Sequence, residues 1–316
     1  MNCITLESTD PFFNLAIEEI LLKKSTEEYL ILGINKPSLI VGKHQSVHRE
    51  VNTKYVTENK IPVIRRISGG GTVFHDDGNL NFTFIRQSEE GSQIDFRKYT
   101  LPVINFLISL GIEAKLEGRN DIKVGELKIS GNAEHIHRCR VLHHGTILFS
   151  ASLELLGNSI RKDKSHYITR AVDSNPSSVM NLKEKLKGFR DILEFRTAMM
   201  DYFLHNLTGA KVYNLSALET AEAELLAITK YNTWEWNWAY GPEYTFKNSF
   251  YLNGADFSCA LYVKDGIIKK CSIEHNGQMI SVSEKLVGCR HMVYDMLKVI
   301  WDEGFFNTKE DIYNFF

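Results

Sequence analysis

Residues 65–82, RRISGGGTVFHDDGNLNF, decide the fold of this chain because they place two sharp turns between short strands. The turns lie at 68–71 and 76–79, and the strand-like segments around them are 63–67, 72–75 and 80–85. Three consecutive glycines carry no Cβ and reach positive φ freely, so successive N–H groups can converge on an anion. The glycines lead into a strand rather than a helix, which excludes the Walker A loop and the dinucleotide-binding fingerprint. The pattern therefore predicts a glycine-rich turn between two strands that can bind an anion.

Polar residues on both sides of the glycines support this anion site. Arg65 and Arg66 precede them, and guanidinium groups suit forked recognition of phosphate or carboxylate. His75 and Asn79 follow in the same stretch. The alternative interpretation is a plain glycine-rich hairpin with solvated arginines. We favour the anion site because several polar groups gather at one turn.

A second polar cluster lies in residues 117–133, EGRNDIKVGELKISGNA. Two short strands joined by Gly125 and Glu126 would bring Asp121 and Lys128 to one cavity. A carboxylate beside a phosphate site suggests Mg²⁺, which prefers one or two carboxylates together with phosphate oxygens and water. Lys128 lies between apolar neighbours and would be a partly buried point charge. An ordinary surface strand with alternating charge is the alternative.

The segment 135–149, HIHRCRVLHHGTILF, contains four histidines and Cys139. The first two histidines would share one face of a strand, whereas His143 and His144 would point to opposite faces. No carboxylate or cysteine completes a recognised zinc spacing. The arginines beside Cys139 are typical of a solvated strand rather than of a nucleophile. The segment therefore favours neither a zinc site nor a catalytic cysteine.

Apolar periodicity and capping residues predict the elements around these segments. Helices are expected after Pro11, over 101–110 and 191–207, after Ser216 and over 290–301, and buried strands over 29–34 and 38–42. Residues 157–181 are rich in Lys, Arg, Ser and Asn without an apolar period, which is typical of an exposed, mobile loop. The aromatic residues of 231–250 would cover the core. A restart of the strand pattern after Tyr251 predicts a domain at 1–247 and a smaller one at 248–316, within a mixed α/β class.

Composition excludes several classes of function. The 316 residues include 37 Lys and Arg against 39 Asp and Glu, so the net charge is −2. This balance lacks the basic character of a general nucleic-acid binder. No apolar run approaches the roughly 18 residues of a membrane span, and no signal or transit peptide is evident at the start. Five scattered cysteines argue against a disulfide framework. We expect a cytoplasmic protein without nucleic-acid or membrane partners.

Five motifs in a fixed order carry a resemblance to a known family. They are NLAIEEILL (14–22), LILGINKPSLIVGKHQSVHREVN (30–52), RRISGGGTVFHDDGNLNFTF (65–84), GRNDIKVGELKISGNA (118–133) and HHGTILF (143–149). Together they resemble the lipoate–protein ligase family, in the form with a C-terminal accessory domain. The resemblance covers 10–250, and the remainder matches only loosely. It implies a mixed α/β catalytic domain of the biotin/lipoate ligase type at 1–247, followed by a small α/β accessory domain at 248–316.

The resemblance also implies an activity. Such enzymes join lipoate to ATP, giving lipoyl-AMP and pyrophosphate, and pass the lipoyl group to a lysine of an acceptor protein. The implied ligands are ATP, Mg²⁺ and lipoate, and the implied acceptors are lipoyl domains of 2-oxoacid dehydrogenase E2 subunits or the glycine-cleavage H protein. Matching positions make Lys128 the catalytic contact to the lipoate carboxylate and the α-phosphate, and Asp121 the metal ligand. The residues expected to bind ATP or lipoate are Arg66, Gly70, Gly71, Thr72, Val73, Phe74, His75, Asn79, Asn120 and Lys128. We expect a monomer, with the loop at 157–181 closing over the adenylate.

Two other functions stay open at this point. A related transferase could use a preformed lipoyl or octanoyl group. The five motifs contain no cysteine, and Cys139 lies between two of them, which argues against thioester exchange, but a transferase acting on ready-made lipoyl-AMP would keep nearly all the motifs. A non-catalytic binder of lipoate or adenylate is the second alternative. Intact Lys128, Arg66 and glycines argue against it.

Overall fold

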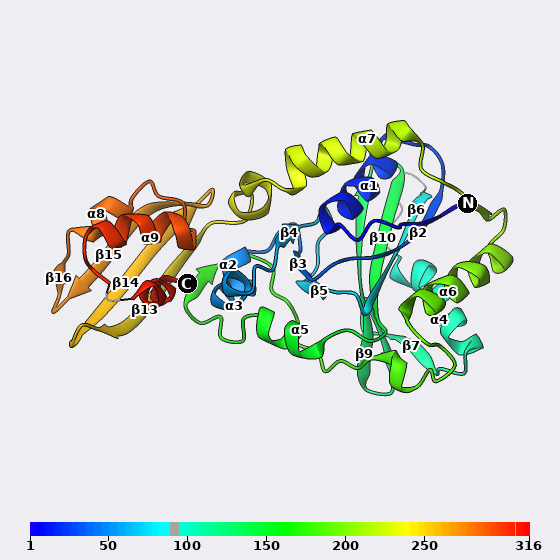
Figure 1. Ribbon diagram of the computed structural model, residues 1–316, viewed down its shortest axis with the longest axis horizontal. Coiled ribbons are helices and arrows are strands. Elements are labelled where there is room, and N and C mark those ends of the chain that lie inside the picture. Colours follow the sequence, from blue (N-terminus) through cyan, green and yellow to red (C-terminus); the bar gives the residue numbers. More distant parts are fainter. Residues whose placement is uncertain (89–94, 307) are drawn as a thin grey trace.

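The computed structural model describes residues 1–88, 95–306 and 308–316, and its architecture is mixed α/β, as predicted (Figure 1). The largest sheet has eight strands in the order β12-β1-β2-β6-β10-β9-β8-β7. Their bounds are β1 Asn2–Thr5, β2 Tyr29–Ile34, β6 Asn79–Gln87, β7 Ala114–Glu117, β8 Asp121–Val124, β9 Leu127–His137, β10 Arg140–Leu148 and β12 Lys211–Val212. β1 pairs in parallel with both β2 and β12, and the remaining neighbours are antiparallel.

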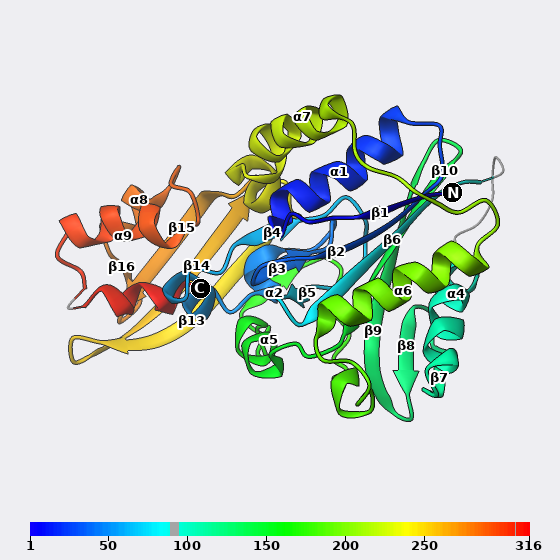
Figure 2. The ribbon, with the colours of Figure 1, turned by 45° about the vertical axis from the view of Figure 1, so that its right-hand side comes forward.

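Helices cover both faces of this sheet (Figure 2). The helices α1 (Pro11–Lys24) and α7 (Ala217–Leu226) lie on one face, and α4 (Phe96–Ser109) and α6 (Ile192–Asn206) lie on the other. Side chains of β2 alternate between the two layers, because Leu30 and Leu32 pack with α4 and α6 while Tyr29 and Ile31 pack with α1. A strand buried on both faces explains why YLILGI is a continuous apolar run.

A three-stranded sheet holds the glycine-rich segment. Its order is β4-β3-β5, with bounds β3 Ser38–Val41, β4 Val63–Arg65 and β5 Val73–His75. β3 pairs in parallel with β4 and antiparallel with β5. The glycines therefore connect two strands that flank a third one, so they do not close a hairpin between neighbours. The short helices α2 (Val47–Glu50) and α3 (Thr53–Glu58) lie beside this sheet.

Side-chain caps set the starts of the long helices. Asp10, Asp95 and Asp191 accept hydrogen bonds from N–H groups in the first turns of α1, α4 and α6. Ser216 and Glu219 form the predicted capping box of α7. Helix α4 begins at Phe96 rather than at the predicted residue 101, because Asp95 caps it one turn earlier than the apolar pattern indicated.

The segment predicted as a mobile loop at 157–181 contains regular structure. Helix α5 (Leu153–Ser159) ends inside it, and β11 (Tyr167–Thr169) pairs with a strand of the second sheet. Lys164 forms an ion pair with Glu50 at 2.8 Å. The expectation of a segment without secondary structure was wrong for these parts, while residues 170–178 are mostly exposed. The turn η1 (Leu182–Glu184) follows.

The C-terminal part builds a second sheet with its own core. The order is β11-β13-β14-β15-β16, with bounds β13 Tyr244–Leu252, β14 Ala255–Lys264, β15 Ile267–His275 and β16 Gln278–Met279. Helices α8 (Val282–Leu286) and α9 (Val293–Asp302) and the turn η4 (Lys309–Phe315) pack on it. The predicted boundary between 247 and 248 falls inside β13, and the division at that point stays a prediction.

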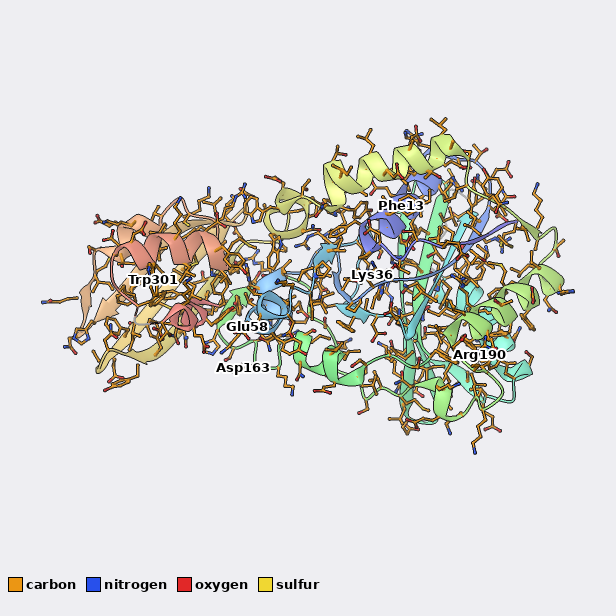
Figure 3. All side chains as sticks on the ribbon, in the orientation of Figure 1. Phe13, Lys36, Glu58, Asp163, Arg190 and Trp301 are labelled. Carbon is orange, nitrogen blue, oxygen red and sulfur yellow. The ribbon has the colours of Figure 1, made fainter. Side chains whose placement is uncertain are left out.

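Two π-helical segments, η2 (Ala227–Tyr231) and η3 (Glu235–Ala239), precede β13 and lead from the first sheet to the second. Figure 3 labels Glu58, on α3, close to the second sheet. One turn earlier on α3, Lys54 forms an ion pair with Glu310 of η4 at 3.3 Å, so α3 contacts the C-terminal part. None of the described helices is both long and apolar enough to cross a membrane.

Candidate functional site

A cavity of about 570 Å³ lies between α1, strands β2, β6, β8, β9 and β10, and the glycine-rich segment. The predicted site residues in its wall are Arg66, Gly70, Gly71, Thr72, Val73, His75, Asn120, Asp121 and Lys128. Strand order therefore brings together two motifs that lie far apart in the sequence. The roles assigned to these residues stay predictions.

The cavity wall combines apolar and polar side chains. Leu15 and Ile31 belong to α1 and β2, and Ile40 and Val73 belong to the three-stranded sheet. Asn120, Asp121 and Lys128 form the polar end of the wall, on β8 and β9 or just before them, and two strands separate β9 from β2. Such a wall suits an elongated molecule with an apolar chain and an anionic head.

Two predicted residues do not line this cavity. Phe74 is buried in the small core of the three-stranded sheet, on the face of β5 opposite Val73 and His75. Asn79 is fully buried, and its Nδ2 donates to Asn81 Oδ1 at 2.9 Å. Asn81 itself lies in the wall. Asn79 therefore lies behind the wall residue that it contacts.

The glycine segment needs glycine at specific points. Gly70 has φ +86°, and a Cβ there would lie 3.0 Å from Arg66 Nη2. A Cβ on Gly42 would lie 2.1 Å from the Gly70 carbonyl oxygen, so the two chain segments approach each other closely. These contacts explain the need for glycine at 42 and 70, whereas a Cβ on Gly69 would meet no atom within 4 Å.

Arg66 holds the carbonyl groups of this segment. Its Nη2 donates to the carbonyl oxygens of Gly69 at 2.5 Å and Gly71 at 2.7 Å, and its Nε donates to Ser68 Oγ at 2.9 Å. In a trans peptide the C=O and the next N–H point in opposite directions, so the Thr72 N–H points away from Arg66. It donates to Ser174 Oγ at 2.9 Å. Burial lowers the pKa of Arg66 to about 10, so the guanidinium stays charged at neutral pH.

Arg65 has a different position, which corrects the interpretation of the two arginines as one anion-binding pair. Its side chain is fully buried and absent from the cavity wall. The guanidinium donates to the carbonyl oxygens of Gly42, Lys43, Gln45, Trp236 and Asn237. Arg65 therefore joins the loop after β3 to the π-helical segment η3.

Lys128 and Asp121 meet at the charged end of the cavity. Lys128 Nζ lies 2.9 Å from Asp121 Oδ1, and each side chain is 22% exposed. The turn between β8 and β9 passes through Gly125 at φ +59°, which brings the two short strands side by side. Asn120 lies just before β8, and its Nδ2 donates to the Asn132 carbonyl oxygen at 2.6 Å, while Asn132 Nδ2 donates to the Asn120 carbonyl oxygen at 2.9 Å. These bonds fix the start of β8 against β9.

His75 lies in the wall in its neutral form. Its Nδ1 accepts from Asn35 Nδ2 at 2.8 Å, and Asn35 Oδ1 in turn accepts from Asn14 Nδ2 at 2.7 Å. Burial, followed by the charge of Arg66 and the neighbouring His144, lowers the pKa of His75 to about 3. The imidazole proton therefore lies on Nε2.

Several wall residues were not predicted from the sequence. Glu18 on α1 is 8% exposed and His144 on β10 lies 2.9 Å from it, as measured from Nδ1 to Oε2. Ser174 reaches the glycine segment from the 157–181 region. The adjacent carboxylates Glu18 and Glu19 in the mostly apolar stretch NLAIEEILL were the available signal for Glu18. His144 faces α1 whereas His143 contacts Glu134 on the other side of the sheet, as the alternation predicts.

Among the described residues, no group of three or more His, Cys, Asp or Glu side chains could together hold a metal ion. Asp121 is a single partly exposed carboxylate on the cavity wall. One carboxylate fits Mg²⁺ when phosphate oxygens and water complete the shell.

A family model and the most similar curated proteins point to the same family. Residues 10–204 match the family model described as the lipoyl protein ligase A/B catalytic domain. Lipoate–protein ligase 1 of Staphylococcus aureus is 37% identical over 289 residues, covering 90% of this chain and 88% of that protein. Lipoate-protein ligase LplJ of Bacillus subtilis is 36% identical over 315 residues, covering 96% and 95%.

Solved structures with the same fold carry relevant ligands. A putative lipoate protein ligase of T. acidophilum with bound lipoic acid aligns with a TM-score of 0.63 and 27% identity, over 75% of this chain and 98% of that one. A lipoate-protein ligase A bound with ATP aligns with a TM-score of 0.61 and 27% identity, over 75% and 97%. A bi-partite lipoate protein ligase from Thermoplasma acidophilum, studied with its E2 lipoyl domain, aligns with a TM-score of 0.63 and 27% identity, over 75% and 95%.

Proposed function

This chain belongs to the lipoate–protein ligase family, and we propose that its cavity joins lipoate to the adenylyl group of ATP and then passes the lipoyl group to an acceptor lysine. The ligase activity that the five motifs predicted is confirmed by the relatives, which match over most of their own lengths. The chain is therefore an enzyme, and lipoate and ATP are its substrates.

One observation of the geometry supports the proposal most directly. Lys128 and the glycine segment line the same cavity, and its wall also holds the apolar side chains Leu15, Ile31 and Ile40. A carboxylate on an aliphatic chain and a triphosphate must meet in such a reaction, and the meeting point must be positively charged. Lys128 supplies that charge at the cavity's polar end.

The first step needs no protein nucleophile. A carboxylate oxygen of lipoate attacks the α-phosphorus of ATP, and the bond from that phosphorus to the bridging oxygen of pyrophosphate breaks. Lys128 offsets the negative charge that builds up between the two anions. For this role its ammonium has to be shared between Asp121 and the substrates, since its Nζ lies 2.9 Å from Asp121 Oδ1.

The second step transfers the acyl group. The amine nitrogen of the acceptor lysine attacks the lipoyl carbonyl carbon, AMP leaves, and the amine gives up a proton. Water must be kept away because it would hydrolyse the mixed anhydride. Residues 172–175 line the cavity beside the glycine segment, and they are the part of the 157–181 region placed to exclude water.

We assign the binding roles by position in the wall. Arg66 orders the glycine segment, in which the N–H groups of Gly70 and Gly71 would donate to phosphate oxygens, while the Thr72 N–H donates to Ser174 Oγ. The neutral His75 and Val73 lie toward the acyl chain, and Asn120 lies beside the polar end. Phe74 and Asn79 would act from behind the wall, by holding β5 and Asn81 in place.

Asp121 is the residue that would hold Mg²⁺. The ion would supply charge neutralisation for the phosphate groups when bound. When no ion is bound, the ion pair with Asp121 keeps Lys128 oriented toward the same end of the cavity.

The acceptor belongs to the class of lipoyl-domain proteins, and one structural relative was studied with an E2 lipoyl domain. For this chain the proposed acceptors are lipoyl domains of 2-oxoacid dehydrogenase E2 subunits or the glycine-cleavage H protein. We also propose that the enzyme is a monomer in the cytoplasm. Its five cysteines are unpaired, which agrees with a reducing compartment.

Lipoate-dependent exchange of labelled pyrophosphate into ATP tests the proposal. We expect exchange with the purified protein and Mg²⁺, and no exchange when lipoate is omitted. Absence of exchange combined with transfer from synthetic lipoyl-AMP to a lipoyl domain would identify a transferase instead. Absence of both reactions would leave only a binder, and the proposal would be wrong.

A further inference from the structure

Four side chains from three parts of the fold form one hydrogen-bonded row beneath the glycine segment. Glu18 Oε2 lies 2.9 Å from His144 Nδ1, and His144 Nε2 lies 2.6 Å from Ser68 Oγ. Ser68 Oγ also lies 2.9 Å from Arg66 Nε. Glu18 comes from α1, His144 from β10, and the other two from the segment after β4.

The protons of this row fit only one direction. The Arg66 Nε–H can only donate, so Ser68 Oγ accepts it. Ser68 is fully buried. Within the described residues, the one acceptor for its hydroxyl proton is His144 Nε2. His144 Nε2 must then accept, which leaves the imidazole proton on Nδ1, where it donates to Glu18. Glu18 Oε1 also accepts from Thr83 Oγ1, so the carboxylate is fixed from two sides.

We infer that His144 is a positioning residue for adenylation, acting through Ser68 on Arg66. The row sets the rotation of the guanidinium, because Nε is held by Ser68 while Nη1 donates to Ile40 and Nη2 to the glycine carbonyls. The negative charge of Glu18 at the far end favours the charged guanidinium, in agreement with its effect on the pKa of Arg66.

The consequence reaches the substrate through the backbone. Arg66 holds the carbonyl oxygens of Gly69 and Gly71, so the following N–H groups point away from it. If Ser68 or His144 is removed, the guanidinium can turn and the carbonyls are released. The N–H group of Gly70 then loses its fixed direction, and the site loses preorganisation for phosphate.

This inference rests on the proposed function, and a double-mutant cycle separates the two. We expect Ser68→Ala and His144→Asn each to lower kcat/KM for ATP in pyrophosphate exchange by about ten- to hundredfold. The kcat/KM of the double variant should lie within about threefold of that of the less active single variant, because both changes break the same row. Independent, multiplying losses would overturn the inference. A wild-type protein that shows no exchange would contradict the proposed function instead.

A second measurement does not depend on activity. Nitrogen-15 NMR of labelled protein distinguishes the two neutral histidine tautomers. We expect His144, assigned from the signal that disappears in His144→Asn, to be protonated on Nδ1, and to lose that preference in Ser68→Ala. A proton on Nε2 in the wild-type protein would reverse the row and overturn the inference.

His143→Asn is the matched control. His143 is the preceding residue on the same strand and is fully buried, and it contacts Glu134 at 2.8 Å and Asn132 Oδ1 at 3.2 Å. Asparagine keeps a donor near that carboxylate. Both partners of His143 line the cavity, so this control tests coupling to Ser68 and not the size of the loss. We expect the losses of His143→Asn and Ser68→Ala to multiply in the double variant, because no contact of His143 reaches Arg66. Losses that fail to multiply would show a general effect of this strand and contradict the inference.

Discussion

Arg65 and Arg66 are adjacent in the chain and both buried, but only the Arg66 guanidinium reaches the cavity wall. Arg65 donates to five backbone carbonyl oxygens in two separate segments, whereas Arg66 donates to the glycine segment and Ser68. One residue therefore stabilises the fold and the other shapes the site.

Lysine substitutions should separate these two roles. Arg65→Lys keeps one charge but can donate at most three hydrogen bonds from a single point, so some carbonyl oxygens lose their partner. We expect a loss of about 3 kcal/mol in the free energy of unfolding, measured in urea. Arg66→Lys should instead lower pyrophosphate exchange by at least about tenfold, because a lysine cannot hold Ser68 and two carbonyl groups together. Equal loss of exchange in the two variants at equal stability would contradict this division.

We expect Ser174 to limit the access of a protease to the segment at 170–178. Its Oγ donates to Glu50 Oε2 at 2.5 Å and accepts from the Thr72 N–H at 2.9 Å, so it holds the segment against the glycines. Ser174→Ala removes both bonds and a third, from Gln45 Nε2 at 3.0 Å, and we expect trypsin to cleave after the exposed Arg170 several-fold faster. Bound lipoyl-AMP should slow this cleavage in the wild-type protein.

Cleavage after Lys187 serves as the internal control for the protease experiment. Lys187 is exposed in a separate turn and belongs to neither the cavity wall nor the segment at 170–178. Its cleavage rate should stay unchanged by Ser174→Ala and by the adenylate. An unchanged rate after Arg170 under both conditions would show that Ser174 does not restrain the segment.

The sequence predicted local structure better than long-range contacts. The strand at 29–34 and the capping box at Ser216 depend on neighbouring residues, and both were predicted correctly. The placement of β3 between β4 and β5 depends on pairing across the chain, which no local pattern encodes. The polar neighbours of the glycines indicated a site, but the contact from Ser174 arises only when the chain folds back.

The two arginines show the same limit of prediction from local sequence. A guanidinium that binds phosphate and one that binds backbone carbonyl groups look alike in sequence, because both need the same donor fork. Burial against η3 distinguishes Arg65, and η3 lies about 170 positions away, as the separation of 171 between Arg65 and Trp236 shows. Glu18 was missed for a related reason, since its partner His144 comes from a distant strand.

His291 makes stability depend on pH. Its Nε2 donates to the Phe315 carbonyl oxygen at 2.8 Å, and its Nδ1 accepts from Tyr244 Oη at 2.5 Å. Burial, aided by the charge of Arg161, lowers the pKa of His291 to about 4 in the folded protein. The unfolded chain binds a proton near pH 6.5, so stability is full above that pH and falls between about 6.5 and 4. We expect a contribution of about 2 kcal/mol to be lost at pH 5.

Urea unfolding of wild type and His291→Gln at pH 7.5 and pH 5 measures this contribution. The variant should lose less stability than wild type when the pH falls, because it has no imidazole to protonate. His205→Gln, which changes an exposed histidine on α6, is the control and should keep the wild-type dependence. An unchanged pH dependence in His291→Gln would assign the effect to another buried histidine, such as His48, whose pKa burial also lowers.

Lys128 carries the sharpest prediction for catalysis. If its ammonium bridges the lipoate carboxylate and the α-phosphate, its charge matters most where those groups meet, so adenylation should suffer more than ground-state binding. A charged hydrogen bond contributes roughly 1.5–3 kcal/mol, and we expect Lys128→Ala to lose at least about a hundredfold in pyrophosphate exchange. Lys128→Arg should recover little, because the wider fork cannot place one point charge between two anions. Lys123→Ala is the matched control: Lys123 has the same side-chain exposure of 22% and an ion pair with Glu117, but it does not line the cavity. Exchange rates of Lys128→Ala that equal those of Lys123→Ala would show that Lys128 is only a surface residue of β9.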